Sequence, residues 1–203
     1  MWIIGITGGV GAGKSSVLEY IKKHCNCRII LADEVGNQVK EPGQICYQQL
    51  VKLLGEQVLM DNGQIHRGKM AEMIFSDKEL LEKVNAIIHP AVQEYILQAI
   101  QEEKEKQEID VFFLEAALLI ECGYTAYLDE LWYIYSNTEV RRKRLKASRQ
   151  YSDEKISQII AKQLSEEEFH KAAQVVIDNS YDFESTCKSL EKECRRLKIW
   201  KET

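Results

Sequence analysis

The sequence predicts an α/β protein built on a five-stranded parallel sheet covered by helices. Short, continuously apolar runs alternate with longer stretches of helical periodicity, and no repeat or low-complexity linker interrupts them. This alternation is typical of a parallel sheet, whose strands are apolar throughout because both faces are buried. With 203 residues, of which 45% are hydrophobic, the chain can bury one core and carry an additional subdomain.

The five expected strands are short apolar runs bounded by polar residues. They are residues 2–6, 28–31, 110–114, 131–135 and 175–177. A helix is expected at 15–23, directly after the first strand. Residues 183–200 place apolar side chains on one helical stripe, which favours packing on the sheet over binding of a partner. The sheet should bind its ligand beyond the carboxyl ends of its strands.

Two longer stretches between strands read as helical. Residues 34–105 should be broken at Pro42-Gly43, at the turn 61–63 and near Pro90. In this stretch Ser76 and Glu79 have the spacing of a capping box, which predicts a helix start there. The second stretch, residues 138–172, is highly charged. It contains another capping-box pair, Ser165 and Glu168.

Composition and charge disfavour several classes of protein. The formal net charge of −5 gives no electrostatic support for general nucleic-acid binding. No run approaches the ~18 apolar residues of a membrane span, and the apolar start is too short for a signal peptide. The six cysteines form no zinc pattern, so reduced thiols are expected. We therefore expect a cytoplasmic protein with no membrane or nucleic-acid partner.

The most specific motif is the string GGVGAGKS at Gly8–Ser15, which fits G-x-x-x-x-G-K-[ST]. Glycines let successive backbone N–H groups converge on phosphates, and the following helix adds its positive dipole end. Lys14 can reach the β- and γ-phosphates, and the Ser15 hydroxyl can ligate Mg²⁺. A chance match is disfavoured because the string lies between an expected strand and an expected helix. The motif predicts a P-loop that binds the phosphates of a nucleotide.

A cluster of basic residues distinguishes between the classes of P-loop protein. It comprises Arg141, Arg142, Lys143, Arg144, Lys146 and Arg149. Placed between the fourth and fifth strands, the cluster favours an arginine-bearing lid over a merely solvated helix face, and such lids are typical of small-molecule kinases. The Asn-Lys-x-Asp string with which GTPases read guanine is absent from the sequence.

The ordered motifs along nearly the whole chain resemble those of one family, the dephospho-CoA kinases of coenzyme A synthesis. They are GITGGVGAGKSS (5–16), ADEV (32–35), EPG (41–43), GEQVL (55–59), DNGQIHR (61–67), IIHP (87–90), LLIE (118–121), Arg144, Gln163 and VIDN (176–179). The resemblance implies transfer of the γ-phosphoryl group of ATP, with Mg²⁺, to the ribose 3′-hydroxyl of dephospho-CoA. It also implies a single P-loop kinase domain with a core (1–33, 106–140 and 173–203), a helical substrate subdomain (about 34–105) and a lid (about 141–172).

The resemblance also implies roles for individual residues. Lys14, Asp33 and Arg144 would be catalytic, with Asp33 facing the attacking hydroxyl. The ATP site would comprise Gly8, Gly9, Gly11, Ala12, Gly13, Lys14, Ser15, Ser16, Arg144, Arg149 and Asn179. The acceptor site would comprise Thr7, Asp33, Arg67, His89 and Leu118. Besides these two substrates we expect no partner except, at most, a second copy in a weak homo-oligomer.

The sequence departs from the family pattern in four ways. Leu31 replaces the first residue of the usual Asp-x-Asp, so Asp33 stands alone. Glu115 and Ala117 replace the acid and the proline of the usual Asp-x-Pro-Leu-Leu. Arg144 and Arg149 are one residue further apart than the usual pair, and Arg141 stands where a glutamine is common.

Simpler interpretations stand beside several of these roles. Asp33 could cap the helix after it, His89 could lie at a helix end with its ring on a carbonyl, and Arg67 could be a surface arginine. Glu115 leaves a buried strand and needs a partner such as Lys14 or a Mg²⁺-bound water.

Two other functions remain open at the level of the sequence. One is a different small-molecule P-loop kinase, such as one acting on a nucleoside monophosphate. The other is a nucleotide-dependent switch without a small substrate, which the absence of a guanine-reading string disfavours.

Overall fold

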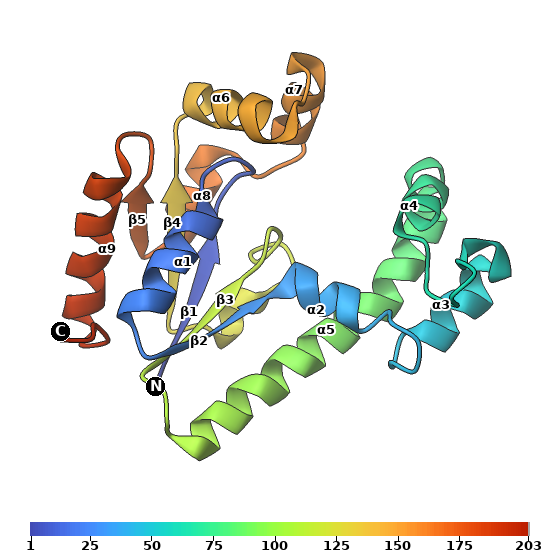
Figure 1. The fold of residues 1–203 in the computed structure, drawn as a ribbon, viewed down its shortest axis with the longest axis horizontal. Coiled ribbons are helices and arrows are strands. Elements are labelled where there is room, and N and C mark those ends of the chain that lie inside the picture. The colour runs from blue at the N-terminus through green and yellow to red at the C-terminus, as the bar shows by residue number, and fades with distance from the viewer. Residues whose placement is uncertain (203) are drawn as a thin grey trace. The chain divides into compact units, whose positions relative to one another are not determined.

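The computed structural model describes residues 1–202 and contains a five-stranded sheet in the order β2-β3-β1-β4-β5 (Figure 1). The strands are β1 (Trp2–Thr7), β2 (Cys27–Leu31), β3 (Val111–Glu115), β4 (Glu130–Tyr135) and β5 (Val175–Asp178). β1 runs parallel to β3 and β4, and β4 runs parallel to β5. The predicted α/β fold with a five-stranded parallel sheet is confirmed.

The chain forms two compact units, one of residues 1–30 with the chain from 103 onward and one of residues 31–102. The first unit holds the sheet and the helices α1 (Lys14–His24), η2 (Tyr124–Tyr127), α6 (Thr138–Arg149), α7 (Asp153–Ala161), α8 (Glu166–Ala172) and α9 (Phe183–Arg196). The second unit holds α2 (Ala32–Gln38), α3 (Tyr47–Leu54), η1 (Glu56–Val58), α4 (Arg67–Ser76) and most of α5 (Lys78–Lys106).

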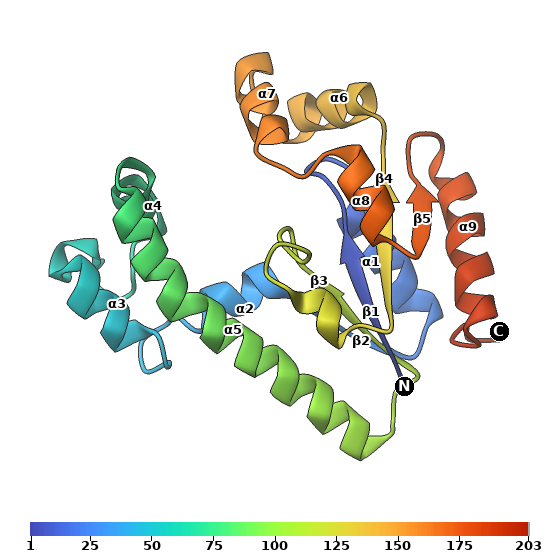
Figure 2. The same cartoon turned by 180° about the vertical axis from the view of Figure 1, so that it is seen from behind.

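Helices cover both faces of the sheet in the first unit. α1 and α9 pack together on one face, and α8 lies on the other (Figures 1 and 2). Ile4, Ile6 and Phe112 are fully buried between these layers, as expected for strands that are apolar on both sides. α6 and α7 lie beyond the carboxyl ends of β1 and β4 (Figure 1). The predicted capping box of α8 is confirmed, with Ser165 and Glu168 each bonding the other's backbone N–H.

The helical unit is packed around its own apolar residues. They include Leu50, Leu54, Val58, Met70 and Val84. The chain breaks predicted at Pro42-Gly43 and at 61–63 are confirmed, since α2 and α3 are separate helices and a β-bridge between Leu59 and Ile65 brackets the second turn.

Two expectations for this unit are wrong. α5 runs for 29 residues through Pro90, so no break occurs there. Proline removes one backbone hydrogen bond, but Val84 and Val92 on either side of it are buried, and that burial outweighs the local loss. Ser76 and Glu79 form no capping box at the start of α5. Instead Asp77 caps it, its carboxylate accepting a hydrogen bond from the Leu80 N–H at 2.9 Å.

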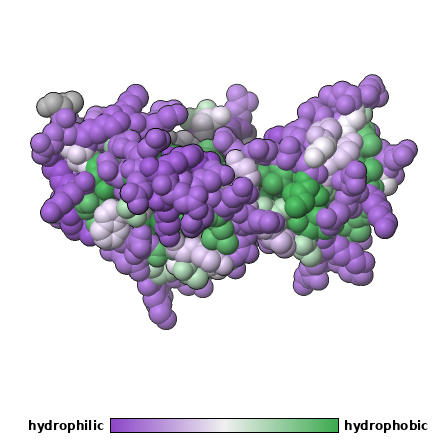
Figure 3. Space-filling model, turned by 90° about the horizontal axis from the view of Figure 1, so that it is seen from below, coloured by the Kyte–Doolittle hydropathy of each residue, from purple (hydrophilic) through white to green (hydrophobic). Residues whose placement is uncertain are grey.

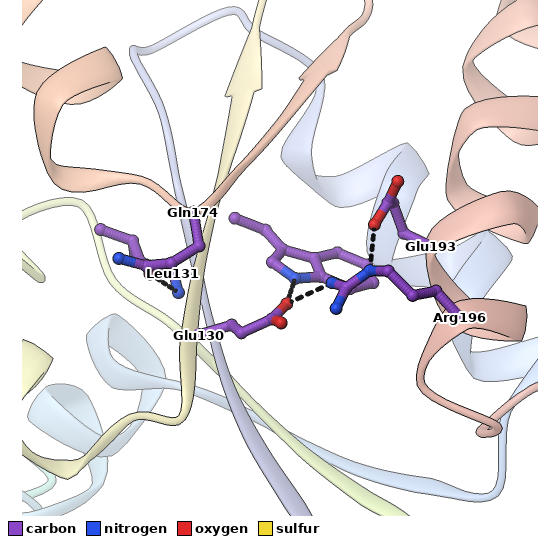
Figure 4. Close-up of polar contacts among 6 residues, drawn as sticks. Glu130, Leu131, Gln174, Glu193 and Arg196 are labelled. Carbon is purple, nitrogen blue, oxygen red and sulfur yellow. Dashed lines mark hydrogen bonds and ion pairs between the residues drawn. The ribbon is translucent and has the colours of Figure 1, made fainter.

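At the amino end of β4 the polar groups are paired with one another (Figure 4). Glu130 accepts hydrogen bonds from Arg196 at 2.7 Å and from the indole N–H of Trp132 at 2.9 Å. Arg196 also binds Glu193 at 2.7 Å. The Leu131 N–H donates to the side chain of Gln174 at 2.7 Å. These bonds tie β4 to the end of α9 and to the start of β5.

The chain beyond α9 returns to the end of α1. Trp200 forms a β-bridge with Cys25 and stacks on His24, with ring centroids 4.8 Å apart. The Lys201 N–H donates to the His24 carbonyl oxygen at 2.8 Å. This contact closes the carboxyl end of α1.

The surface seen in Figure 3 is mostly hydrophilic, with hydrophobic groups in scattered patches. Within residues 1–202, no helix has both the length and the apolar character that a membrane crossing requires.

Candidate active site

The glycine-rich loop joins the central strand β1 to α1, as the motif predicts. Gly8, Gly11 and Gly13 have φ values of 145°, 84° and 90°, a region that side chains disfavour. A Cβ at Gly8 would also strike the carbonyl oxygen of Ile134 in the neighbouring strand β4. The loop therefore needs glycine both for its conformation and for its close approach to the sheet.

Lys14, the first residue of α1, points back over this loop. Its ammonium group donates a hydrogen bond to the Gly8 carbonyl oxygen at 2.8 Å and lies 3.5 Å from the Glu115 carboxylate. Both side chains are only 14% exposed. Glu115 reaches this position because Ile6 and Glu115 are paired in the parallel ladder of β1 and β3. Of the two partners suggested for Glu115, the structure has Lys14.

Thr7 ends β1 immediately before the loop. It is fully buried, and its hydroxyl oxygen has no hydrogen-bond partner within residues 1–202. An unsatisfied buried hydroxyl costs about 1–3 kcal/mol. Such a cost is tolerated most readily where a ligand or an ordered water completes the bonding.

A groove of about 420 Å³ opens beside the loop, between the starts of α1 and α9. Its walls are Gly13, Ser16, Glu19, Tyr20, Lys23, Arg144, Asn179 and Phe183. The rings of Tyr20 and Phe183 meet edge to face, with centroids 6.1 Å apart. Two aromatic rings among polar and charged side chains suit a planar ligand that carries polar groups.

Arg144 and Asn179 connect this groove to the loop. Asn179 donates from its side-chain amide to the Ala12 carbonyl oxygen at 2.8 Å and accepts from Thr186 at 3.0 Å. Arg144 donates to the carbonyl oxygens of Asn179 at 2.9 Å and of Ala12 at 3.3 Å. Since Asn179 is 2% exposed, its amide is a fixed part of the loop's support.

Arg141 is buried beneath the loop, which the sequence did not suggest. Its guanidinium group donates to the Val10 carbonyl oxygen at 3.0 Å and to the side-chain oxygen of Gln163 at 2.6 Å. The same Gln163 oxygen accepts from the Val10 N–H at 3.2 Å. We call Val10, Arg141 and Gln163 the Val10 clasp.

Two predicted site residues of the first unit, Arg149 and Leu118, belong neither to the groove nor to the strand and loop at residues 7–16. Arg149 is exposed at the end of α6 beside Tyr151, and their hydrogen bond is the main reason that the pKa of the Tyr151 phenol is lowered. Leu118 follows β3 and is 50% exposed.

The remaining predicted site residues belong to the helical unit. Asp33 is exposed in the first turn of α2, whose N-cap is Leu31 with no side-chain cap bond, so the helix-cap interpretation of Asp33 is wrong. His89 is exposed inside α5 and not at a helix end, so the helix-end interpretation of His89 is wrong too.

Arg67 begins α4 and, with Lys40, lines a cavity of about 190 Å³. Burial, followed by the nearby charge of Arg67, lowers the pKa of Lys40.

Comparison with known proteins identifies this arrangement. A family model described as dephospho-CoA kinase matches residues 2–184. The chain belongs to the dephospho-CoA kinase family. It is 38% identical to the dephospho-CoA kinase of Carboxydothermus hydrogenoformans over 185 residues, which cover 91% of this chain and 88% of that one.

Solved structures agree with this assignment. A Thermus thermophilus protein, TT1252, is similar with a TM-score of 0.80 and 28% identity, covering 97% of both chains. The dephospho-CoA kinase from Campylobacter jejuni has the same fold, with a TM-score of 0.73, 21% identity and 96% coverage of both chains. As a dephospho-CoA kinase family member, the chain is an ATP-using kinase of the final step of coenzyme A synthesis, and the nucleoside monophosphate alternative is not favoured.

Several residues around the kinase site were missed by the motifs. Tyr20, Lys23 and Phe183 line the groove but belong to no motif. Lys40, in the helical unit, was also missed. Tyr20 lies four residues after Ser16, on the same face of α1, so helical periodicity was the signal that could have found it.

Proposed function

We propose that the chain transfers the γ-phosphoryl group of ATP to the 3′-hydroxyl of the ribose of dephospho-CoA. The observation that carries this proposal is Lys14, held between the Gly8 carbonyl and Glu115 at the mouth of the glycine-rich loop. A point charge at this position can follow the charge that develops between the β- and γ-phosphates during transfer.

ATP would lie along the loop with its adenine in the groove. Backbone N–H groups of Gly11 to Ser16 would bind the phosphates at the start of α1, where the helix dipole is positive. Arg144 and Asn179 line the groove, which supports their contact with the nucleotide. For Arg144 also to act on the transferring phosphoryl group, it would have to release its bonds to Ala12 and Asn179. Arg149 would reach ATP only on lid movement.

Mg²⁺ fits the oxygen donors at this edge of the sheet. The Ser15 hydroxyl is exposed at the start of α1, and the Glu115 carboxylate lies 3.5 Å from the ammonium group of the preceding residue, Lys14. Residues 1–202 contain no cluster of three His, Cys, Asp or Glu side chains suited to a metal. That donor set suits Mg²⁺, which is held mainly by phosphates and waters and neutralises phosphate charge when bound.

Asp33 would orient the attacking hydroxyl and accept its proton. Its carboxylate is exposed and makes no cap bond in α2, so it is available for this role. Thr7, Arg67, His89 and Leu118 would complete the acceptor site within the helical subdomain and its surroundings. The cationic pair of Lys40 and Arg67 supports binding of an anionic acceptor.

The segment 141–172 would act as a lid that responds to ATP. Its arginines match the triphosphate oxygens of ATP. Hydrogen exchange in this segment should slow when an ATP analogue is added. Slowing confined to residues 34–105 would contradict a lid.

The direct test is ADP release by the purified chain with dephospho-CoA, CMP, UMP or AMP as the acceptor. We expect turnover with dephospho-CoA alone and its loss in excess EDTA. Equal or faster turnover with a nucleoside monophosphate would overturn the proposed acceptor, and full activity in EDTA would overturn the role of Mg²⁺.

A further inference from the structure

Arg141 has surroundings unlike those of the other lid arginines. It is 5% exposed, whereas Arg142 and Arg149 lie nearer the solvent. Within residues 1–202 its guanidinium group forms no ion pair with a carboxylate, and its hydrogen-bond partners are the neutral oxygens of Val10 and Gln163. A buried charge is costly unless an opposite charge compensates it.

The glycine-rich loop is shaped to receive this side chain. A Cβ at Gly9 would strike the central carbon and both terminal nitrogens of the Arg141 guanidinium group. Gly9 is not among the glycines with positive φ. A side chain at position 9 would have to displace the Arg141 guanidinium group from its bonds to Val10 and Gln163, whereas the backbone conformation there does not require glycine.

None of the titratable groups around Arg141 neutralises its positive charge through an ion pair. Burial is the first cause that lowers the pKa of Arg141, and the groups that oppose this are Tyr133, Glu166 and Tyr135. The pKa of Tyr133 is raised to about 12, chiefly by burial, so this phenol is neutral at pH 7. Glu166 is exposed at the start of α8. Within residues 1–202 no carboxylate pairs with Arg141, so an anion bound at the loop would be its compensating charge.

We propose that Arg141 is a positioning residue that fixes the Gly8–Val10 part of the loop and supplies a buried positive charge to the phosphates of ATP. Through the Val10 clasp, both backbone groups of Val10 are held, one by Arg141 and one by Gln163. Arg141 lies near the start of α6 and Gln163 follows the end of α7. The clasp therefore joins both ends of the segment formed by α6 and α7 to the loop. This inference rests on the proposed binding of ATP phosphates by the loop.

The alternative is that the clasp only holds the chain together, and Gln163→Glu separates the two roles. A glutamate keeps an oxygen that accepts from both Arg141 and Val10, and its charge strengthens those bonds. The same charge neutralises Arg141. Arg141→Gln also lowers the local charge by one unit, but it does so by removing the positive charge. Gln158→Glu, on the exposed face of α7, is the matched control for an added carboxylate.

The dissociation constants of ATP and adenosine, and the melting temperature, are measured for the full-length variants. We expect Gln163→Glu to weaken ATP binding on the order of tenfold, with adenosine affected less than twofold and an unchanged or higher melting temperature. Arg141→Gln should weaken ATP by a similar factor, and Gln158→Glu should change it less than twofold.

Unchanged ATP affinity in Gln163→Glu would overturn the proposal, as would equal losses for ATP and adenosine. If Arg141→Gln does not fold, the result for Gln163→Glu still decides. Lys14→Ala tests the underlying function separately. If it fails to weaken ATP, the loop is not the phosphate site. If it weakens ATP while Gln163→Glu does not, only the role of Arg141 is lost.

Discussion

The two ends of the central sheet both carry charged side chains, but they satisfy them differently. At the amino end of β4, Arg196 is matched by Glu130 and Glu193 at 2.7 Å each (Figure 4). At the carboxyl end, Arg141 and Arg144 donate to carbonyl, hydroxyl or amide oxygens. Lys14 is 3.5 Å from its carboxylate, a longer contact than any at the amino end.

The difference shows which end of the sheet is built for an anion. Neutral oxygens satisfy the hydrogen bonds of a cation but leave its net charge in place. Two arginines treated in this way, Arg141 and Arg144, flank one glycine-rich loop and create a positive potential that a polyphosphate can use. At the amino end, the carboxylates of Glu130 and Glu193 offset the charge of Arg196, and these contacts serve the fold.

Removing Lys14 should have the largest effect on this comparison. Lys14→Ala should lower kcat on the order of 10³-fold, because the charge at the β- and γ-phosphates is lost in the transition state. The protein should stay folded, as judged by its melting temperature. Lys22→Ala, an exposed lysine of the same helix, is the control. Retention of more than a tenth of wild-type turnover by Lys14→Ala would remove Lys14 from the mechanism.

Asp33→Asn should have the next largest effect. It keeps the shape of the side chain but removes its charge, so kcat should fall on the order of 10²-fold with the ATP affinity nearly unchanged. Glu34→Gln removes the same charge from the same turn of α2 and accounts for the interaction with the helix dipole. Similar turnover in both variants would show that Asp33 has no special role.

At the amino end, Glu130→Gln should affect stability and not turnover. The free energy of unfolding should fall by about 1 kcal/mol, a modest amount because Arg196 is 45% exposed. The melting temperature should fall by about 2–4 °C, with kcat unchanged. A clear change in kcat would mean that the amino end also takes part in the function.

The pH dependence of this variant follows from the pKa of Glu130. Its hydrogen bond from Arg196 holds that pKa below the ordinary value of 4.5. Because the folded pKa is the lower one, the pair contributes fully above pH 4.5 and its contribution is lost as pH falls through the folded pKa. The stability difference between wild type and Glu130→Gln should therefore be constant near neutral pH and shrink in acid.

The strands and the phosphate loop could be predicted because their signals are contiguous in the chain. Each of the five strands was located to within one or two residues at either end, since an apolar run bounded by polar residues reports burial directly. The loop needs its glycines, lysine and serine in consecutive order. The roles of Asp33 and Asn179 came instead from a resemblance.

The contacts between distant segments could not be predicted. Val10, Arg141 and Gln163 are separated by up to 153 residues, and no spacing rule joins them. The helix through Pro90 is a case in which tertiary burial outweighs a local signal. Asp77 was missed as a cap because the Ser76–Glu79 spacing gave the same signal one residue earlier.

The contact of Trp200 and Lys201 with the end of α1 has a practical consequence for handling this protein. The helix that starts at the phosphate loop is completed at His24 and Cys25 by Lys201 and Trp200, from the far end of the sequence. Trimming the chain at the end of α9 would remove the bridge to Cys25 and destabilise the carboxyl end of α1. A purification tag fused directly after Lys201 would crowd the same place, whereas a flexible spacer would keep the bridge intact.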